Sequence, residues 1–195
     1  MADPALVLAS GSPRRREMLS GLGLDFRVDP ADVDESAADG ESPIAYVRRI
    51  ASSKATTVAA RHPSAVVLAA DTTIDLDGEI LAKPVDADEA VTMLSALSGR
   101  SHLAHTAVAL AHGGLLEVFD VSTTVQMRPI GESEIAWYVG TGEPLDKAGA
   151  YAIQGRAAAF VSAVAGSVSN IVGLPLAETV AGLRAAGIRV CDTAD

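Results

Sequence analysis

Short apolar runs, polar turns and amphipathic stretches succeed one another along most of this chain. An apolar run at residues 6–9 leads into Ser10-Gly11-Ser12, which indicates a buried strand that ends in a tight turn. Ser12 followed by Pro13 is typical of a helix start, and the apolar stripe after it stops at Gly23. The N-terminal segment therefore predicts a strand, a turn and a helix.

The same start signal recurs at Ser42-Pro43 and predicts a second helix, with Lys54 on its apolar face. Residues 65–70 then form a continuous apolar run with β-branched members, as expected for a strand buried on both faces. This strand is predicted to be parallel and to end at Asp71. Before the second helix, residues 29–40 are rich in Asp, Ala and Ser and predict an exposed acidic loop.

The remaining pattern predicts further elements and one long irregular segment. The expected elements are a hairpin at 74–81, a helix at 88–97, hairpin strands at 103–110 and 115–125, a helix from Ser133 to Val139, a core strand at 157–164, a helix at 176–186 and an edge strand at 188–190. Residues 140–155 are rich in glycine and polar side chains. Long ordered loops of this kind are often functional.

Composition places the chain among ordinary globular proteins. Its 195 residues are 49% hydrophobic and 21% charged, which suits one domain and excludes a disordered chain. The net charge of -10 repels a nucleic-acid backbone, so we expect no nucleic-acid partner. An anionic ligand would have to be small and to meet a local basic cluster.

The cysteine content and the apolar stretches of the sequence also bear on the cellular location of the protein. Cys191 is the single cysteine, so an intramolecular disulfide is impossible, which suits the cytosol. Residues 1–4 lack the basic region of a signal peptide, and the stretch 157–165 is far shorter than the roughly 20 residues that span a bilayer. We therefore expect a cytoplasmic protein with no membrane partner.

Arg14 and Arg15 lie in the opening turn of the first predicted helix, where the helix dipole disfavours positive charge. A bound anion would reverse that penalty, because backbone N–H groups, serine hydroxyls and two guanidinium groups would surround it. The alternative is a solvated basic turn without a ligand.

Three other charged residues are also candidates for a functional site. Asp71 follows the predicted buried strand, where a carboxylate could hold a metal or polarise a water, or could simply start a turn. Lys54 could extend to solvent or face a polar cleft. Lys83 precedes a proline, which keeps its backbone extended and could direct the side chain from the end of the hairpin.

Several common sites are disfavoured. The four histidines show no zinc-ligand spacing, and neither a Gly-x-Gly-x-x-Gly nor a P-loop lysine motif follows the first strand.

Taken together, the motifs resemble the Maf family of nucleoside triphosphate pyrophosphatases. They are Leu8-Ala9-Ser10-Gly11-Ser12-Pro13-Arg14-Arg15, Ala70-Asp71-Thr72, Leu81-Ala82-Lys83-Pro84, Leu97-Ser98-Gly99, Glu143-Pro144-Leu145-Asp146-Lys147-Ala148-Gly149-Ala150-Tyr151 with Ile153-Gln154-Gly155, and Gly173-Leu174-Pro175-Leu176. The resemblance implies a mixed, strongly twisted α/β sheet flanked by helices, with a deep cleft between two lobes of a single domain over residues 1–195, akin to the inosine triphosphatase fold. It further implies a possible homodimer.

The resemblance also implies an activity. Such enzymes use a divalent cation, Mg²⁺ or Mn²⁺, to hydrolyse a nucleoside triphosphate between its α and β phosphates. By similarity, Asp71 is the general base and a metal ligand, and Glu35 is an acidic residue near the metal. The polyphosphate-binding set is Ser10, Arg14, Arg15, Lys54 and Lys83. The base-selecting positions are Arg14, Thr72 and Gln154, as in the branch that prefers dTTP and UTP, with modified pyrimidine nucleotides as further substrates in a house-cleaning role.

Two residues depart from the family motifs, and two alternative functions remain open. Ala152 replaces a glycine that is common in the family, and Val168 replaces an aromatic residue. Both changes concern the shape of the base pocket more than the reaction. A sugar-nucleotide type of nucleotidyltransferase also binds triphosphates at a Gly-Ser-x-Arg turn. A non-enzymatic nucleotide-binding regulator of septum formation, linked to cell-division arrest, is the second alternative.

Overall fold

A seven-stranded mixed sheet forms the centre of the computed structural model, which describes residues 5–190 and leaves Cys191 outside. The strand order is β2-β1-β3-β5-β6-β7, with β4 paired to β3 off this path. β1 pairs in parallel with β2 and β3, and the other described pairs are antiparallel. The strands span Leu6–Leu8 (β1), Phe26–Val28 (β2), Val66–Leu76 (β3), Glu79–Leu81 (β4), Ser101–His112 (β5), Leu115–Met127 (β6) and Val161–Ala165 (β7).

Helices flank the sheet, which confirms the predicted mixed α/β class. The α-helices span Pro13–Gly21 (α1), Pro43–Ala59 (α2), Ala87–Leu97 (α3), Glu132–Val139 (α4), Val168–Val172 (α5) and Leu176–Ala185 (α6), and 3-10 helices span Glu143–Asp146 (η1), Ala148–Ala150 (η2) and Arg156–Phe160 (η3). The Ser12 and Ser42 side chains cap α1 and α2 as predicted, each with a proline in the first turn. In the described part of the chain, no helix is long and apolar enough to span a membrane.

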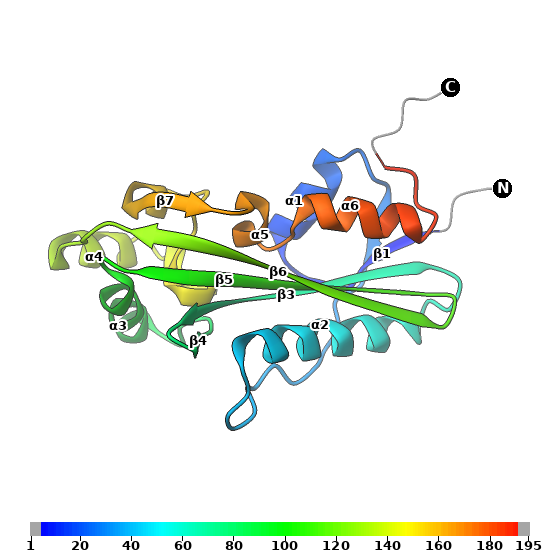
Figure 1. The fold of residues 1–195 in the computed structure, drawn as a ribbon, viewed down its shortest axis with the longest axis horizontal. Coiled ribbons are helices and arrows are strands. Elements are labelled where there is room, and N and C mark those ends of the chain that lie inside the picture. The colour runs from blue at the N-terminus through cyan, green and yellow to red at the C-terminus, as the bar shows by residue number, and fades with distance from the viewer. Residues whose placement is uncertain (1–4, 191–195) are drawn as a thin grey trace.

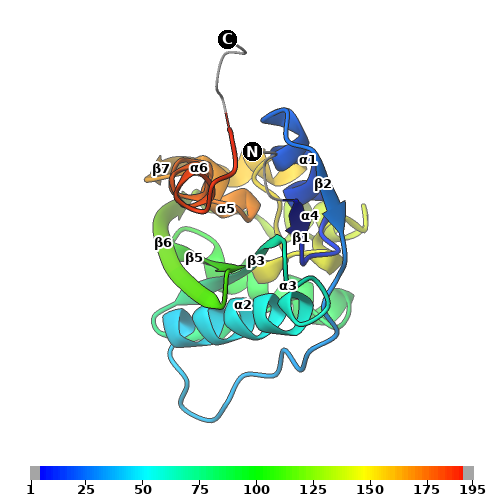
Figure 2. The same cartoon turned by 90° about the vertical axis from the view of Figure 1, so that its right-hand side faces the viewer.

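One half of the sheet has helices on both faces (Figures 1 and 2). α2 covers one face, where Val47 packs in a buried cluster with Val67. α1 and α6 cover the opposite face, where Leu19 and Leu183 pack with Leu68. Full burial of one such side chain contributes about 1.5–3 kcal/mol, so these two clusters fix the first half of the fold.

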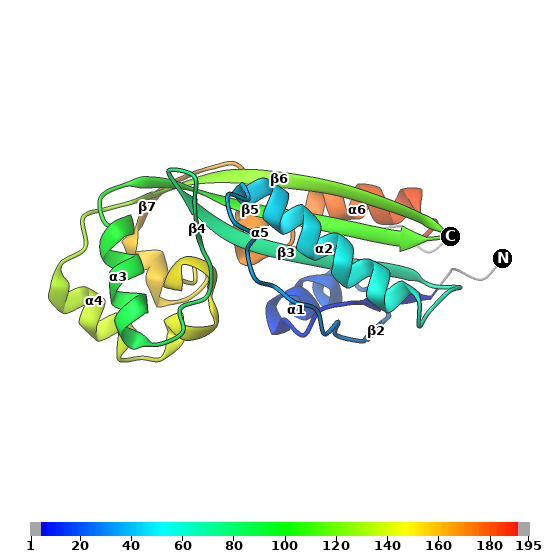
Figure 3. The same ribbon diagram turned by 90° about the horizontal axis from the view of Figure 1, so that it is seen from below.

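The long strands β3, β5 and β6 continue to a second group of elements, made by α3, α4, β4, β7 and the 3-10 helices (Figure 3). Leu97, Tyr138 and Phe160 are buried at its centre. Gly149 has a φ of 65°, and a Cβ there would lie 2.7 Å from Cγ1 of Ile74. A residue without a side chain therefore lets the segment after η1 lie directly against β3.

The structure corrects the expected end of the third strand. β3 does not end before Asp71 but continues to Leu76, because its antiparallel pairing with β5 runs on to Asp75 opposite Leu103. Asp71 is therefore in the middle of a strand. It lies beyond the last residue of β1, because the parallel pairing of β1 with β3 stops at Leu8 opposite Leu68.

Four smaller differences have local causes. α4 begins after Gly131 rather than at Ser133, because the Glu134 carboxylate accepts the Gly131 N–H at 3.0 Å. Residues 156–160 form η3 instead of the start of a strand, and residues 188–190 stay against α6 through the Ile188 N–H, which donates to the Leu183 carbonyl at 2.9 Å. β2 and α5 have no counterpart in the predicted elements, because each is too short to give a periodic pattern.

Candidate functional site

A cavity of about 490 Å³ lies between the turn after β1, the middle of β3 and the segment from η1 to residue 154. All nine residues that were singled out from the sequence line it. They are Ser10, Arg14, Arg15, Glu35, Lys54, Asp71, Thr72, Lys83 and Gln154. The structure therefore brings together residues from six separate parts of the chain.

Arg15 forms a buried part of the wall at the start of α1. Its Nε donates to the Gly173 carbonyl at 2.8 Å, Nη1 donates to Ser10 Oγ at 3.1 Å and Nη2 donates to Thr72 Oγ1 at 3.0 Å. Burial lowers the pKa of Arg15, and the nearby carboxylate of Asp71 opposes that effect. A guanidinium has five N–H donors, so donors remain beyond these three bonds.

Lys54 connects two carboxylates at the other side of the cavity. Its Nζ lies 2.8 Å from Asp71 Oδ1 and 2.8 Å from Glu35 Oε1. The apolar residues around Lys54 on α2 pack against the sheet and direct the lysine into the cavity rather than to solvent. The structure thus resolves the two interpretations of Lys54 in favour of a cleft position.

The two carboxylates respond differently to this lysine. Burial raises the pKa of Asp71, against the lowering effect of Lys54 and Arg15. Burial also acts to raise the pKa of Glu35, but its hydrogen bond to Lys54 and the lysine charge outweigh it, so the pKa lies below its usual value. Asp71 is thus the more basic carboxylate of the pair.

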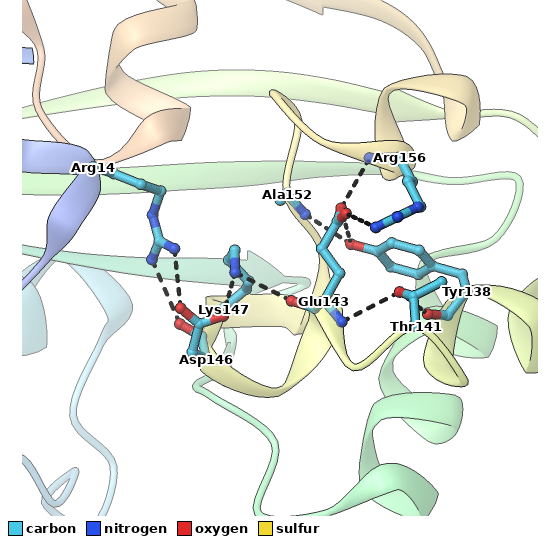
Figure 4. Close-up of polar contacts among 8 residues, drawn as sticks. All are labelled: Arg14, Tyr138, Thr141, Glu143, Asp146, Lys147, Ala152 and Arg156. Carbon is cyan, nitrogen blue, oxygen red and sulfur yellow. Dashed lines mark hydrogen bonds and ion pairs between the residues drawn. The ribbon is translucent and has the colours of Figure 1, made fainter. Parts of the chain in front are cut away.

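Arg14 reaches across the cavity mouth to the other group of elements (Figure 4). Its Nη1 lies 3.2 Å from Oδ2 of Asp146 in η1, and the same carboxylate forms a close ion pair with Lys147. Lys83 and Gln154 are exposed and line the cavity at its outer part. The mouth therefore carries three cationic groups and one carboxylate.

Two contributors to the site were not predicted individually. The Tyr46 hydroxyl donates to the Glu35 carbonyl at 3.0 Å and so holds the acidic loop near α2, while burial raises the pKa of Tyr46 to about 12. Asp146 lies in the irregular segment that was expected to be functional, but its partner Arg14 is 132 residues away. A tyrosine near the start of an amphipathic helix was the available signal for Tyr46.

Residues 5–186 match the model of a protein family that is described as Maf-like protein. The chain belongs to the Maf family. It is 56% identical to a dTTP/UTP pyrophosphatase of Myxococcus xanthus over 183 residues, which are 94% of this chain and 93% of the relative. A dTTP/UTP pyrophosphatase of Anaeromyxobacter dehalogenans is 58% identical over 189 residues, with 94% and 95% covered. For one from Symbiobacterium thermophilum, the identity is 51% over 90% of both chains.

Among solved structures, the Ham1 protein of Staphylococcus aureus matches this Maf-family chain in part. The two are 17% identical, with a TM-score of 0.47, and the match covers 63% of this chain and 71% of the other.

Proposed function

We propose that this Maf-family protein hydrolyses dTTP and UTP between the α and β phosphates and releases the nucleoside monophosphate and pyrophosphate. The observation that carries the proposal is the buried Asp71–Lys54–Glu35 cluster, which faces two arginines within one cavity. The names of the relatives supply the substrate class.

The basic side chains would bind the polyphosphate. Ser10, Arg14, Arg15, Lys54 and Lys83 are the proposed contacts, and charge on the pyrophosphate increases as the bond to the α phosphate breaks. Fixed cations in a cavity shielded from solvent stabilise such developing charge more strongly than water does. Arg15 is already oriented by three hydrogen bonds, so little reorganisation would be needed.

Asp71 is the proposed general base. It would accept a proton from the attacking water, and a carboxylate whose pKa is raised by burial is a better acceptor than an exposed one. Lys54 would keep that carboxylate ionised in the free protein through its 2.8 Å contact. The lysine is therefore proposed both to hold the base ionised and to bind phosphate.

A divalent cation fits the oxygen donors of this cluster. Mg²⁺ is commonly held by one or two carboxylates together with substrate phosphates, and Glu35 and Asp71 already lie against one ammonium. In the described residues, no group of three or more His, Cys, Asp or Glu side chains could hold a metal by itself, so substrate oxygens would have to complete the shell. When bound, Mg²⁺ or Mn²⁺ would supply Lewis-acid charge neutralisation at the phosphates.

Arg14, Thr72 and Gln154 are the proposed base-selecting residues. Gln154 offers an amide with both donor and acceptor groups, which can complement the 4-oxo and N3–H groups shared by uracil and thymine. Thr72 Oγ1 already accepts a bond from Arg15 and lies 2.9 Å from Thr106 Oγ1. We therefore assign Thr72 an indirect part, through the position of Arg15.

One experiment tests the proposal against its two alternatives. The protein is incubated with Mg²⁺ and a panel of canonical and modified triphosphates, and pyrophosphate release is measured with and without sugar phosphates. Release from dTTP or UTP without an acceptor is the expected result. Release that requires a sugar phosphate would indicate a nucleotidyltransferase, and nucleotide binding without any cleavage would indicate a regulator.

We also propose a cytoplasmic, single-domain enzyme that forms a homodimer. Light scattering coupled to size exclusion would test the dimer, and one cooperative unfolding transition would support the single domain.

A further inference from the structure

Glu143 is a mostly buried carboxylate that lies behind the cavity wall. It starts η1, its side chain is 15% exposed, and it is absent from the cavity lining, which includes the neighbouring residues 146–148 and 151–154. Any influence of Glu143 on a nucleotide must therefore pass through the residues that do line the cavity.

The carboxylate holds the segment that carries Gln154 (Figure 4). Glu143 Oε1 accepts the Arg156 backbone N–H at 2.9 Å and the Tyr138 hydroxyl at 3.0 Å. The Tyr138 hydroxyl in turn accepts the Ala152 N–H at 3.1 Å. The backbone is thus bound two residues before and two residues after Gln154.

The fit between this carboxylate and the turn is close. A Cβ at Gly155 would lie 2.2 Å from Glu143 Oε1, so any side chain there would displace the carboxylate. Burial raises the pKa of Tyr138, with a further increase from Glu143, so the hydroxyl stays a donor to the carboxylate. Tyr138 is itself fixed in the core by an edge-on contact with Phe160.

Gln154 depends on this support, because residues 151–155 form no regular helix or strand. Among the described residues, its side-chain amide has no hydrogen-bond partner and lines the cavity. An amide that selects between two bases must reach a fixed point, since a loose one can also turn over and match cytosine.

We propose that Glu143, through Tyr138 and the backbone at residues 152 and 156, is a positioning residue that sets the nucleobase preference of Gln154. The inference rests on the proposed function. It assigns Glu143 no contact with the nucleotide and no part in the bond cleavage.

The test combines Glu143→Ala, Gln154→Ala and the double variant, with kcat and KM measured for UTP and CTP. Loss of one fixed hydrogen bond to the base lowers discrimination about tenfold, so Glu143→Ala should reduce the UTP over CTP ratio of kcat/KM by about that factor, mainly through KM. Because both residues act on one contact, the double variant should discriminate no less than Gln154→Ala alone. A double variant whose loss of discrimination equals the product of the two single losses would overturn the inference.

Matched variants separate positioning from a loss of stability. Glu134→Ala removes another carboxylate of the same group of elements, which binds Arg128 and the Gly131 N–H away from the cavity, and should leave the ratio unchanged. Tyr138→Phe keeps the ring but loses both hydroxyl bonds, so it should lower the ratio even if Glu143→Ala fails to fold. Glu143→Gln keeps an oxygen acceptor and should retain most of the UTP over CTP ratio that Glu143→Ala loses. A Glu134→Ala effect equal to that of Glu143→Ala would overturn the inference.

Binding of UMP and CMP, measured by calorimetry, distinguishes this inference from the proposed function. If the wild-type protein cleaves no triphosphate but binds UMP more tightly than CMP, the proposed function fails, and the variants still test the positioning role. If the wild type cleaves UTP but binds both monophosphates equally, the reaction stands and the positioning role is wrong.

Discussion

The Lys54 ammonium lies 2.8 Å from Oδ1 of Asp71, and both side chains are about nine-tenths buried. A buried carboxylate is costly unless it is paired, and loss of one partner leaves the other charge uncompensated. The contact therefore links the stability of the site to the ionisation of its proposed base.

Asp71→Asn should lower kcat by about 10²–10⁴-fold, because an amide cannot accept the proton of the attacking water. In the absence of Mg²⁺, UTP affinity should stay the same or rise, since a negative charge is removed beside a polyanion. Steady-state hydrolysis and calorimetric binding of UTP would check both effects. Asp75→Asn is a matched control on the same strand, because Asp75 binds His105 outside the cavity. Unchanged turnover in Asp71→Asn would exclude Asp71 as the base.

Lys54→Met should move the acid limb of the kcat/KM profile to higher pH. Burial raises the pKa of Asp71 and Lys54 opposes that rise, so loss of the lysine raises the pKa further. The ionised base then requires a higher pH. A pH series from 5 to 9 with UTP well below its KM would measure the limb, and a shift toward lower pH would contradict the assigned role.

Asp146→Asn should strengthen pyrophosphate binding by roughly fivefold at low salt, because one negative charge leaves the cavity mouth beside Arg14. The gain should fade at high salt. Stability should change by less than about 1 kcal/mol, since Asp146 is exposed. Asp77→Asn removes a comparable exposed partner, that of Arg100, outside the large cavity and should leave pyrophosphate affinity unchanged. Weaker binding in Asp146→Asn would mean that Asp146 is needed to orient Arg14.

Local signals explain what could be predicted from the sequence. Ser12 and Ser42 accept backbone N–H groups three residues ahead, so the caps of α1 and α2 depend on neighbouring residues alone. The apolar run before Asp71 likewise predicts a buried strand, and β3 is buried throughout its first six residues.

The arrangement of the cavity residues depends on long-range contacts that no local sequence pattern encodes. Arg15 donates to the carbonyl of Gly173, 158 residues away, and the Asp71 position within β3 depends on pairing with β5. Gly155 leaves the space that the Glu143 carboxylate occupies, although the two residues are not neighbours in the sequence. Motif resemblance could identify the residues of the cavity, but their partners required the folded chain.

His102 should make the stability of the protein pH-dependent between about pH 6.5 and 4. It is buried, its Nε2 lies 2.8 Å from the Tyr151 hydroxyl, and burial lowers the pKa of His102 to about 4. In the unfolded chain the imidazole has an ordinary pKa near 6.5, so the unfolded state binds a proton first as the pH falls. Stability is therefore full above pH 6.5 and is lost as the pH falls to the folded-state value.

The loss from this residue should reach about 3 kcal/mol by pH 4. His102→Gln removes the titrating ring but keeps a group that can bond to Tyr151, so its free energy of unfolding should vary less with pH over this window. Denaturant unfolding of both proteins at several pH values would measure the difference. Carboxylates such as Glu134, whose hydrogen bonds lower its pKa to about 2, are common to both proteins and cancel in the comparison. Parallel pH profiles for the two proteins would show that His102 does not titrate in this window.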